Sequence, residues 1–242
     1  MSQIDPTSSA DLPSLDAPLP QGEEKGAAVQ AMFDTIAPRY DLVNRIMTFR
    51  LDVRWRKEAI EVLRLPRGSL LLDLATGTGD FCRELYEFGY RSVGADFSYG
   101  MLAAARTDEP LLQGDGMQLP IANGSVDGVT CGFALRNFVD LQAVFDELGR
   151  VVRPGGRIAL LDASAPDNPI LRFGHSIYFG KVVPLIGGLL SNREAYGYLP
   201  RSLEYLPPRE ELLQWLESAG FGHVHHRQLT LGAAQLITAT KL

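Results

Sequence analysis

The chain has few cysteines and no long run of basic residues. Cys82 and Cys131 are its 2 cysteines, too few and too far apart for a disulfide framework or a zinc knuckle. Acidic residues outnumber basic ones by 29 to 23, and no cluster of Lys and Arg is long enough to follow a phosphate backbone. We therefore expect buried free thiols in a reducing cytoplasm, with no metal site and no nucleic-acid partner.

The chain also lacks an export pattern. No basic segment at the N-terminus leads into an apolar run, so we expect a cytoplasmic protein. Hydrophobic residues make up 45% and charged residues 21% of the chain, which is the balance of an ordinary soluble globular protein. At 242 residues there is room for one substantial domain with its own core.

Three segments differ from the rest of the chain in pattern. Residues 1–25 are rich in Ser, Pro, Asp and Ala without periodicity, which predicts a disordered tail before a single domain at 26–242. Residues 26–66 carry apolar residues at helical spacing and predict an N-terminal helical cap. Residues 163–208 form an apolar insertion, but Arg172 and Lys181 interrupt its core at Ile170–Leu190. A lid or a helix at a membrane surface is expected there rather than a spanning helix.

Between these segments, short apolar strands alternate with amphipathic helices, as in a parallel sheet covered on both faces. The expected strands are 70–74, 92–96, 111–113, 128–132, 157–161, 224–230 and 234–241, and the expected helices are 80–88, 99–106, 141–152 and 209–219. Only Leu231–Ala233 separates the last two strands, so they must pair antiparallel. The predicted fold class is α/β, a doubly wound and mostly parallel seven-stranded sheet with an antiparallel terminal strand.

The most informative segment is Leu71–Asp80, a buried strand that runs into a glycine loop. Such a loop lets a ligand approach the backbone at the start of the next helix. A dinucleotide fingerprint has a third glycine three positions after the second, where this chain has Cys82. Asp73 and Asp80 flank the loop and would repel a pyrophosphate. The loop therefore favours a cationic nucleoside, S-adenosylmethionine.

Carboxylates at the ends of later strands extend this site. Asp96 ends the second strand, 19 residues after Gly77, where it can accept both ribose hydroxyls of an adenosine. Its alternative role is to cap the next helix, which Ser98 can also do. Asp115 closes the third strand on the adenine side, or serves only as a turn residue in its Gly-Asp-Gly loop.

Two residues of the glycine loop have structural alternatives as well. Thr78 can meet the amino-acid half of the cofactor or cap the following helix. Asp73 can bind the cofactor ammonium or support the loop as a buried carboxylate. The predicted cofactor-binding residues are Asp73, Gly77, Thr78, Gly79, Asp96, Asp115 and Gly116.

The predicted sheet is the arrangement of class I S-adenosylmethionine-dependent methyltransferases. From about Val29 to Leu242 the chain resembles, more closely, the methyltransferases of ubiquinone and menaquinone biosynthesis. The matching segments are Met32–Asn44, Asp73–Asp80, Asp96–Ser98, Phe133–Asn137, Leu148–Gly156 and Tyr196–Ser202. The glycine loop and the Arg-Pro-Gly-Gly turn are shared by many methyltransferases, whereas the first, fourth and last of these segments are far more specific. Thr76 and Gly132 depart from the family pattern.

The resemblance implies C-methylation of a demethylated polyprenyl quinol, in the first place demethylmenaquinol. The ring carbon becomes a good nucleophile only when the neighbouring phenol loses its proton. Arg136 is therefore predicted to stabilise the phenolate or to hold a water that relays the proton. Asn137 and Tyr40 are predicted to orient the ring. Simple lid packing explains Tyr40 equally well, and a solvated loop is the alternative for Phe133–Asn137.

Several alternatives stay open at this point. The acceptor could be a benzoquinol, a sterol or a phospholipid headgroup, and the rival classes are a nicotinamide-dependent oxidoreductase and a silent cofactor-binding scaffold. Because a polyprenyl tail is insoluble in water, we expect peripheral contact with the inner face of a membrane. Ile170–Leu190 and the N-terminal helix are the candidates for that contact, with a plain hydrophobic core as their alternative. The sequence leaves open whether the protein is a monomer or a homodimer.

Overall fold

The computed structural model describes residues 19–190 and 193–242, so most of the predicted tail lies outside the described residues. Helix α1 (Gly22–Ile36) begins within the segment predicted to be disordered. Its Lys25 is buried, donates to the Phe138 carbonyl at 2.6 Å and lies 3.8 Å from the Tyr205 ring centroid. The predicted end of the tail at residue 25 was wrong, because these distant partners order the first turn of α1.

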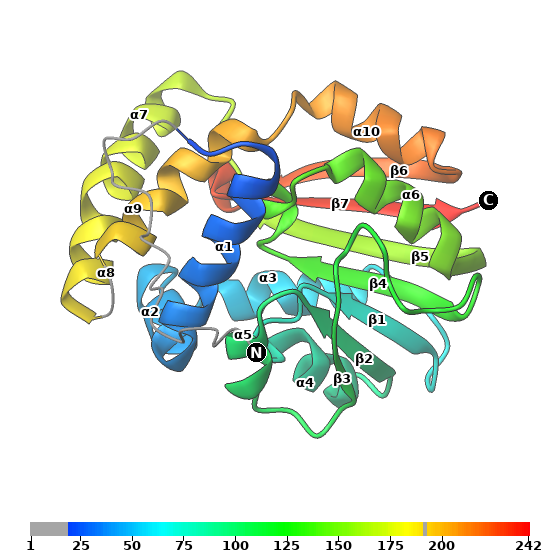
Figure 1. Cartoon of the computed structure of the whole chain (residues 1–242). Helices are drawn as coiled ribbons and strands as arrows, with labels where there is room; N and C mark the ends of the chain where they lie inside the picture. The colour runs from blue at the N-terminus through cyan, green and yellow to red at the C-terminus, as the bar shows by residue number, and fades with distance from the viewer. Residues whose placement is uncertain (1–18, 191–192) are drawn as a thin grey trace.

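A seven-stranded sheet in the order β3-β2-β1-β4-β5-β7-β6 forms the centre of the molecule (Figure 1). Strand β7 runs antiparallel to both of its neighbours, and the other pairs are parallel. The predicted fold class is therefore confirmed. The strands are β1 (Leu70–Leu74), β2 (Arg91–Asp96), β3 (Leu111–Gln113), β4 (Val126–Gly132), β5 (Val152–Ala163), β6 (Phe221–Leu229) and β7 (Ala234–Lys241).

Side chains of the central strands alternate between two hydrophobic clusters, one on each face of the sheet. On β1, Leu71 packs in the cluster that contains helix α3, and Leu72 packs in the cluster that contains α6. Successive residues of a strand point to opposite faces, so both faces need a covering layer. The covering helices are α3 (Leu51–Glu61) and α4 (Asp80–Glu87) on one face, and α6 (Leu141–Val151) and α10 (Arg209–Ser218) on the other.

The predicted strand at residues 157–161 is longer in the structure. β5 already starts at Val152, because Val152 pairs with Val126 at the beginning of β4. At its other end it continues to Ala163, so that Asp162 is part of the strand. The carboxyl end of β5 therefore brings a second carboxylate to the same edge of the sheet as Asp96 of β2.

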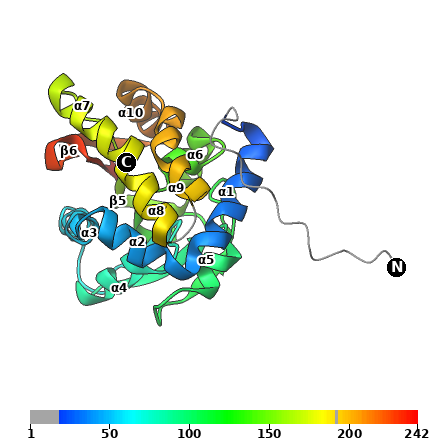
Figure 2. The ribbon, with the colours of Figure 1, turned by 90° about the vertical axis from the view of Figure 1, so that its left-hand side faces the viewer.

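Helices from the N-terminal segment and from the insertion form one layer over the carboxyl ends of the parallel strands (Figures 1 and 2). Met32 and Ile36 of α1 share a buried cluster with Val183 from the insertion. None of the described helices is long and apolar enough to cross a bilayer. Besides α1, the layer contains α2 (Tyr40–Met47), α7 (Pro169–Ile177), a π-helical turn (Tyr178–Val182), α8 (Val183–Leu190) and α9 (Arg193–Ser202).

A buried ion cluster joins α3 to α4. Arg56 of α3 lies 3.0 Å from Asp52 and from Asp80, and 2.9 Å from Glu84. Arg45 of α2 also contacts Asp52 at 2.5 Å and Asp80 at 2.9 Å. Removing one partner from such a cluster leaves uncompensated charge out of water, which is strongly unfavourable.

We therefore expect Arg56→Met to lower the free energy of unfolding by about 3–5 kcal/mol, because Glu84 then loses its arginine partner and Asp52 and Asp80 each lose one of their cations. Urea denaturation followed by circular dichroism measures the change. The neighbouring Lys57, 3.7 Å from the exposed Glu87, provides the control, and Lys57→Met should change the free energy by no more than about 1 kcal/mol. Equal effects of the two substitutions would contradict a stabilising role for the buried cluster.

Candidate functional site

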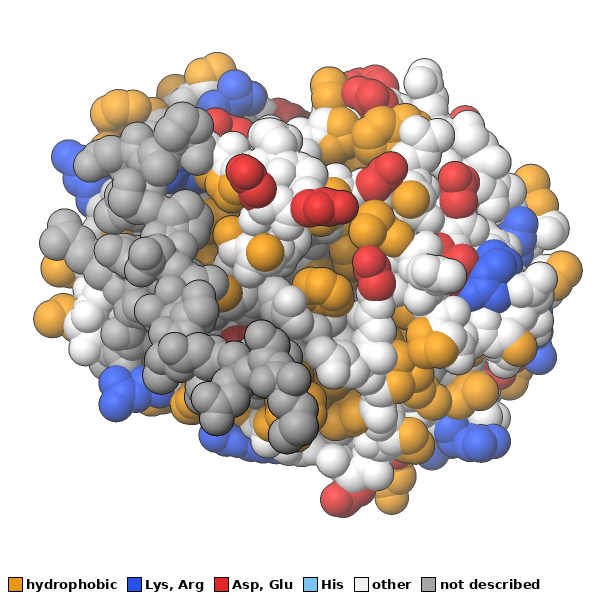
Figure 3. Space-filling view, viewed as in Figure 1, with side chains coloured by type: hydrophobic (Ala, Val, Ile, Leu, Met, Phe, Trp, Pro, Cys, Tyr) orange, Lys and Arg blue, Asp and Glu red, His pale blue; other side chains and the backbone are white. Residues whose placement is uncertain are grey.

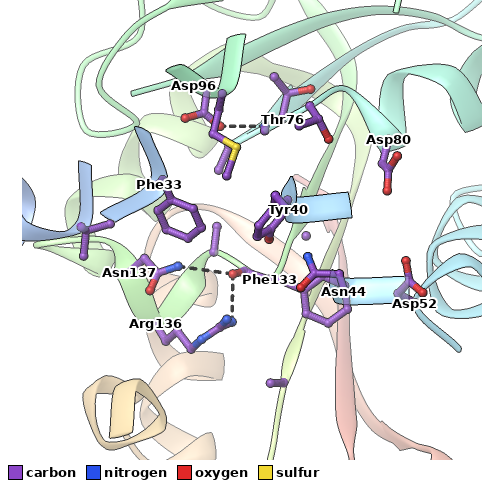
Figure 4. A pocket seen from close by; sticks show the side chains of 18 of the residues that line it. Phe33, Tyr40, Asn44, Asp52, Thr76, Asp80, Asp96, Phe133, Arg136 and Asn137 are labelled. Atoms are coloured by element: carbon purple, nitrogen blue, oxygen red, sulfur yellow. Dashed lines mark hydrogen bonds between the residues drawn. The ribbon is translucent and has the colours of Figure 1, made fainter. Parts of the chain in front are cut away.

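A cavity of about 490 Å³ lies at the carboxyl ends of β1, β2 and β4, beneath α1, α2 and α7. This volume is typical of pockets that bind small molecules. Figure 4 shows Asp96 at one end, Arg136 and Asn137 at the other, and Phe33 and Tyr40 between them. Within the described part of the chain, Asp73 and Gly79 are the predicted site residues that do not line it. Those that do are Tyr40, Gly77, Thr78, Asp96, Asp115, Gly116, Arg136 and Asn137.

Asp73 supports the glycine loop from below. Its carboxylate is buried and accepts hydrogen bonds from the hydroxyls of Thr76 at 2.6 Å and Thr130 at 2.9 Å. Burial raises its pKa to about 7, so the group is mostly neutral below that pH. Asp73 thus supports the glycine loop as a buried carboxylate and does not line the cavity. The same burial raises the pKa of the neighbouring Cys82 thiol to about 12, and both Cys82 and Cys131 are free and buried.

Asp80, the other carboxylate flanking the loop, stays charged and is paired with three arginines. Arg45 and Arg56 lie 2.9 Å and 3.0 Å from its Oδ2, and Arg83 pairs with its Oδ1. These cations hold the pKa of Asp80 below its usual value against the effect of burial. The predicted repulsion of a phosphate by two charged carboxylates was therefore wrong, because Asp73 is buried and the charge of Asp80 is compensated.

Asp96 is the carboxylate that the structure presents to the cavity at the end of β2. Its Oδ2 accepts the N–H of Gly77 at 2.7 Å, and its Oδ1 accepts the N–H of Ser98 at 2.8 Å. The side chain of Ser98, not that of Asp96, caps helix α5 (Tyr99–Ala103) by accepting the Met101 N–H at 3.1 Å. A carboxylate offers about four acceptor positions, so these two bonds leave room for ligand hydroxyls.

The residues of the glycine loop have different roles. Gly77 adopts a φ of +56°, and a Cβ on it would meet no protein atom within 4 Å, so the backbone lies open at the cavity. Gly79 adopts a φ of +82° as the N-cap of α4, and a Cβ there would lie 2.7 Å from Thr107. Gly79 thus shapes the turn. The capping alternative for Thr78 was wrong, since its hydroxyl donates to Asp41 of α2 at 2.5 Å.

Asp115 and Gly116 form the wall beyond β3. The Oδ1 of Asp115 accepts the Met117 N–H at 2.9 Å, so Asp115 holds a turn and lines the cavity at the same time. A Cβ on Gly116 would lie 2.8 Å from the Phe138 ring. Glycine therefore lets the backbone and the aromatic ring approach each other closely at this wall.

Arg136, in the short helix Leu135–Asn137, is fixed by three groups. Its guanidinium forms an ion pair with Asp162, donates to the Phe133 carbonyl at 2.8 Å and donates to the Ser202 hydroxyl at 3.0 Å. Arg136 lines the cavity, whereas Asp162 is fully buried behind it and does not. The positive end of this buried pair therefore faces the cavity. The sequence prediction missed Asp162, although its place at a strand end is the signal that identified Asp96.

Tyr40 and Asn137 both line the cavity, Asn137 beside Arg136 and Tyr40 between the two ends. The Tyr40 ring packs edge-to-face on Phe33 with centroids 5.9 Å apart, and burial raises its pKa while a hydrogen bond with Asn44 opposes that rise. Asn137 donates to the Phe133 carbonyl at 3.4 Å and accepts the Tyr198 hydroxyl at 3.4 Å. Tyr40 therefore packs against the N-terminal helices and also lines the cavity.

The lining of the loop end fits S-adenosylmethionine. The open backbone at Gly77 leaves space, and Asp96 and Asp115 supply acceptors for hydroxyl and amino groups. The guanidinium groups of Arg45, Arg56 and Arg83 around the loop are each paired with a carboxylate, so they do not form a phosphate site. No cluster of His, Cys, Asp or Glu suited to a metal ion occurs in residues 19–190 and 193–242.

The chain matches the model of the ubiE/COQ5 methyltransferase family over residues 21–241. It belongs to this family. It is 41% identical over 231 residues to a demethylmenaquinone methyltransferase of Roseiflexus castenholzii, covering 92% of this chain and 97% of the relative. It is 40% identical over 225 residues to the ubiquinone/menaquinone biosynthesis C-methyltransferase UbiE of Syntrophotalea carbinolica, covering 89% of this chain and 95% of that protein.

Solved structures agree on the fold. A SAM-dependent methyltransferase from Thermotoga maritima matches with a TM-score of 0.63 at 18% identity, covering 88% of this chain and 100% of that chain. Phosphoethanolamine N-methyltransferase 2 from Haemonchus contortus, solved with S-adenosyl-L-methionine, matches with a TM-score of 0.57 at 14% identity, covering 78% of this chain and 52% of that chain. These likenesses show the fold, and the family shows that the protein is an S-adenosylmethionine-dependent C-methyltransferase and not a nicotinamide-dependent oxidoreductase.

The burial of Asp73 has a consequence for stability. Its pKa is about 7 in the folded protein against 3.8 in an ordinary environment, so the folded state binds a proton that the unfolded state releases between these values. Stability from this group is therefore present at low pH and lost as the pH rises to 7. The free energy of unfolding of the wild type should therefore fall by up to about 3 kcal/mol between pH 5 and pH 8 because of Asp73, and Asp73→Asn should abolish this part of the fall.

Urea unfolding at pH 5 and pH 8 measures this difference. Asp108 is an exposed carboxylate, and Asp108→Asn serves as the control that should leave the pH dependence of the wild type in place. If Asp73→Asn also left the pH dependence unaltered, Asp73 would be charged throughout this range in the folded protein.

Proposed function

We propose that this enzyme transfers a methyl group from S-adenosylmethionine to a ring carbon of demethylmenaquinol, forming menaquinol. The observation that carries the proposal is one cavity with carboxylates at one end and a buried guanidinium at the other. The ring assignment is supported by relatives named demethylmenaquinone methyltransferase in Roseiflexus castenholzii and in Thermus thermophilus, each 41% identical. Mass spectrometry of quinones in cells that lack the protein tests it, with accumulated demethylmenaquinone as the expected result and an accumulated demethylated benzoquinone as the contrary one.

The loop end of the cavity holds the methyl donor in this proposal. Asp96 accepts the ribose hydroxyls, Asp115 and Gly116 meet the adenine, and the open backbone at Gly77 with Thr78 meets the amino-acid part. Each of these residues lines the cavity. S-adenosylmethionine supplies an electrophilic methyl group when it is bound.

Asp96→Asn removes the charge and keeps one of the two oxygens that accept the N–H groups of Gly77 and Ser98. A hydrogen bond to a charged acceptor contributes about 1.5–3 kcal/mol, so the dissociation constant for S-adenosylmethionine should rise by about one to two orders of magnitude. Isothermal titration calorimetry measures the change. Asp146 on α6 is exposed and outside the cavity, and Asp146→Asn should bind as the wild type does. Unchanged affinity in Asp96→Asn would remove Asp96 from the cofactor site.

The acceptor end acts on the quinol in this proposal. When the phenol gives its proton to water, negative charge is placed on the oxygen and, by resonance, on the neighbouring ring carbon. This carbon bonds to the methyl group as the sulfur–methyl bond breaks, and it then loses its hydrogen as a proton to water, which restores the aromatic ring. Arg136 stabilises this phenolate because its guanidinium faces the cavity with Asp162 behind it. Asp162 also fixes the guanidinium in position, so little reorganisation is needed when the charge develops. Asn137 and Tyr40 orient the ring, and the apolar walls at Val29, Phe33 and Phe179 accept the start of the prenyl tail.

A charge-neutral double substitution tests Arg136. Arg136→Ala alone would leave Asp162 buried without its partner, at a cost of about 3–5 kcal/mol, and would confuse stability with catalysis. Arg136→Gln combined with Asp162→Asn removes both charges together. We expect kcat to fall by about 10²–10³-fold while the affinity for S-adenosylmethionine stays near that of the wild type.

A labelled-methyl assay with a short-tail demethylmenaquinol measures the rate, and calorimetry measures the affinity. The exposed ion pair between Arg209 and Asp167 provides the control, since Arg209→Gln with Asp167→Asn should leave both quantities unchanged. Loss of cofactor affinity in proportion to the loss of rate in the first variant would contradict the proposed role of Arg136.

The prenyl tail determines where the substrate is found. A polyprenyl quinol is dissolved in lipid and not in water, so we propose that the enzyme takes its acceptor from the inner face of a membrane as a peripheral protein. The helices of the insertion support this proposal, because Gly174, Tyr178 and Val183 line the cavity while α7 itself has no fully buried residue.

A further inference from the structure

The outer side of the insertion carries a stripe of exposed large hydrophobic residues. Starting in α7 and ending in α8, the stripe contains Ile170, Phe173, Ile177, Leu185 and Leu189. Residues three and four positions apart share a face of a helix, and Lys181 fills the corresponding place between Ile177 and Leu185. The π-helical turn at Tyr178–Val182 winds less per residue than an α-helix. It therefore keeps the second half of the stripe in line with the first.

A second stripe lies on α2 and directly after it. Leu42, Ile46 and Phe49 are exposed and follow each other at helical spacing. The two stripes adjoin, because the Phe49 and Tyr178 rings are 6.3 Å apart and the Tyr178 hydroxyl donates to the Met47 carbonyl at 2.5 Å. Figure 2 looks onto α2, α7 and α8 together. We call the surface formed by both stripes the docking face.

The docking face is basic although the chain is acidic. The net charge of the protein is −6, yet the segments 42–51 and 169–190 contain no Asp or Glu. Their exposed cations are Arg50, Arg172 and Lys181. At the left rim of Figure 3, over α7 and α8, both hydrophobic and basic side chains are visible. Apolar side chains surrounded by cations complement the surface of an anionic bilayer, where the cations meet headgroups and the apolar groups enter the acyl region.

The inner side of the same helix reaches the cavity. Gly174 and His175 of α7, Tyr178 and Phe179 of the π-helical turn and Val183 of α8 line it, whereas the exposed stripe points away from it. One continuous helical segment therefore separates the acceptor end of the site from the docking face. A tail that leaves the cavity past this segment reaches the docking face directly.

We propose that the docking face binds an anionic lipid bilayer with α2, α7 and α8 lying in the headgroup region, so that the cavity opens toward the lipid. The proposal rests on the proposed function and deepens it by naming the surface that meets the membrane. Insertion of the exposed side chains supplies the hydrophobic part of the binding, and Arg50, Arg172 and Lys181 supply the electrostatic part.

Vesicle flotation with phosphatidylcholine and phosphatidylglycerol, compared with phosphatidylcholine alone, tests the docking face. Phe173→Ser with Leu189→Ser should reduce the partition coefficient by at least about tenfold, because two large apolar side chains no longer enter the acyl region. Phe173 and Leu189 are 70% and 78% exposed, so loss of folding is not expected, and thermal unfolding checks this.

The matched control removes equally exposed residues elsewhere. Tyr86 on α4 and Leu242 at the C-terminus are 69% and 72% exposed, and Tyr86→Ser with Leu242→Ser should bind vesicles as the wild type does. A third variant, Lys181→Gln, should weaken binding to the anionic vesicles and leave the weaker binding to phosphatidylcholine unchanged. Equal binding by the two double variants would overturn the proposal, as would a homodimer that only Phe173→Ser with Leu189→Ser dissociates in light scattering.

A soluble substrate separates this proposal from the proposed function. All variants should methylate a demethylmenaquinol with a single isoprene unit at the wild-type rate, while Phe173→Ser with Leu189→Ser should be slow on a long-tail quinol embedded in vesicles. If the wild type left the soluble quinol unmethylated, the proposed function would fail whatever the vesicle result. If it methylated the soluble quinol but bound no vesicles, the docking face and the proposed membrane contact would fail, whereas the proposed methyl transfer to the quinol would stand.

Discussion

The hydrogen bond from the Gly77 N–H to Asp96, 2.7 Å long, is the interaction on which the arrangement of the site depends. It ties the loop after β1 to the end of β2, and the Thr76 N–H reinforces the connection by donating to the Ala95 carbonyl at 3.0 Å. The parallel register of the two strands brings their carboxyl ends together, so a loop of glycines can fold across the neighbouring strand. Beyond it, Ser98 caps helix α5, and its hydroxyl donates to the carboxylate of Asp34 on α1. Ser98 therefore links helix α1 to Asp96, because its N–H donates to Asp96 and its hydroxyl donates to Asp34.

Compensated charge explains how one cavity has two ends of opposite character. The charge of Asp80 at the loop is compensated by arginines, and Asp73 is buried with a raised pKa. Asp96 is left as the acceptor for a ligand that carries hydroxyl groups and positive charge. At the other end the order is reversed, because Asp162 is buried behind Arg136 and the cation faces the cavity. A cationic donor and an anionic acceptor are therefore each drawn to a different end.

Local pattern in the sequence was sufficient for the order of strands along the chain and for Asp96 at the end of β2, since apolar runs and turn residues act over a few positions. It was insufficient for hydrogen bonds between residues far apart in the sequence. The Thr78 hydroxyl donates to Asp41 of α2, and no local spacing predicts this contact. The alternative that Thr78 caps the next helix was therefore wrong. Asp162 was missed because the predicted strand stopped one residue short of it. The protonation of Asp73 depends on burial beneath a folded loop, which the sequence does not contain as a local signal.

The insertion shows why an apolar segment need not be a plain core. A helix that is hydrophobic all round requires cover on every side, yet the segment from Ile170 to Leu189 is covered by the cap on part of its surface only. Its inner side lines the cavity, and its outer side is exposed. The proposed polyprenyl substrate and the proposed membrane contact give each apolar side an apolar partner, the prenyl tail on the inner side and the bilayer on the outer side. In this proposal the helical segment lies between the bilayer and the cavity that holds the methyl donor.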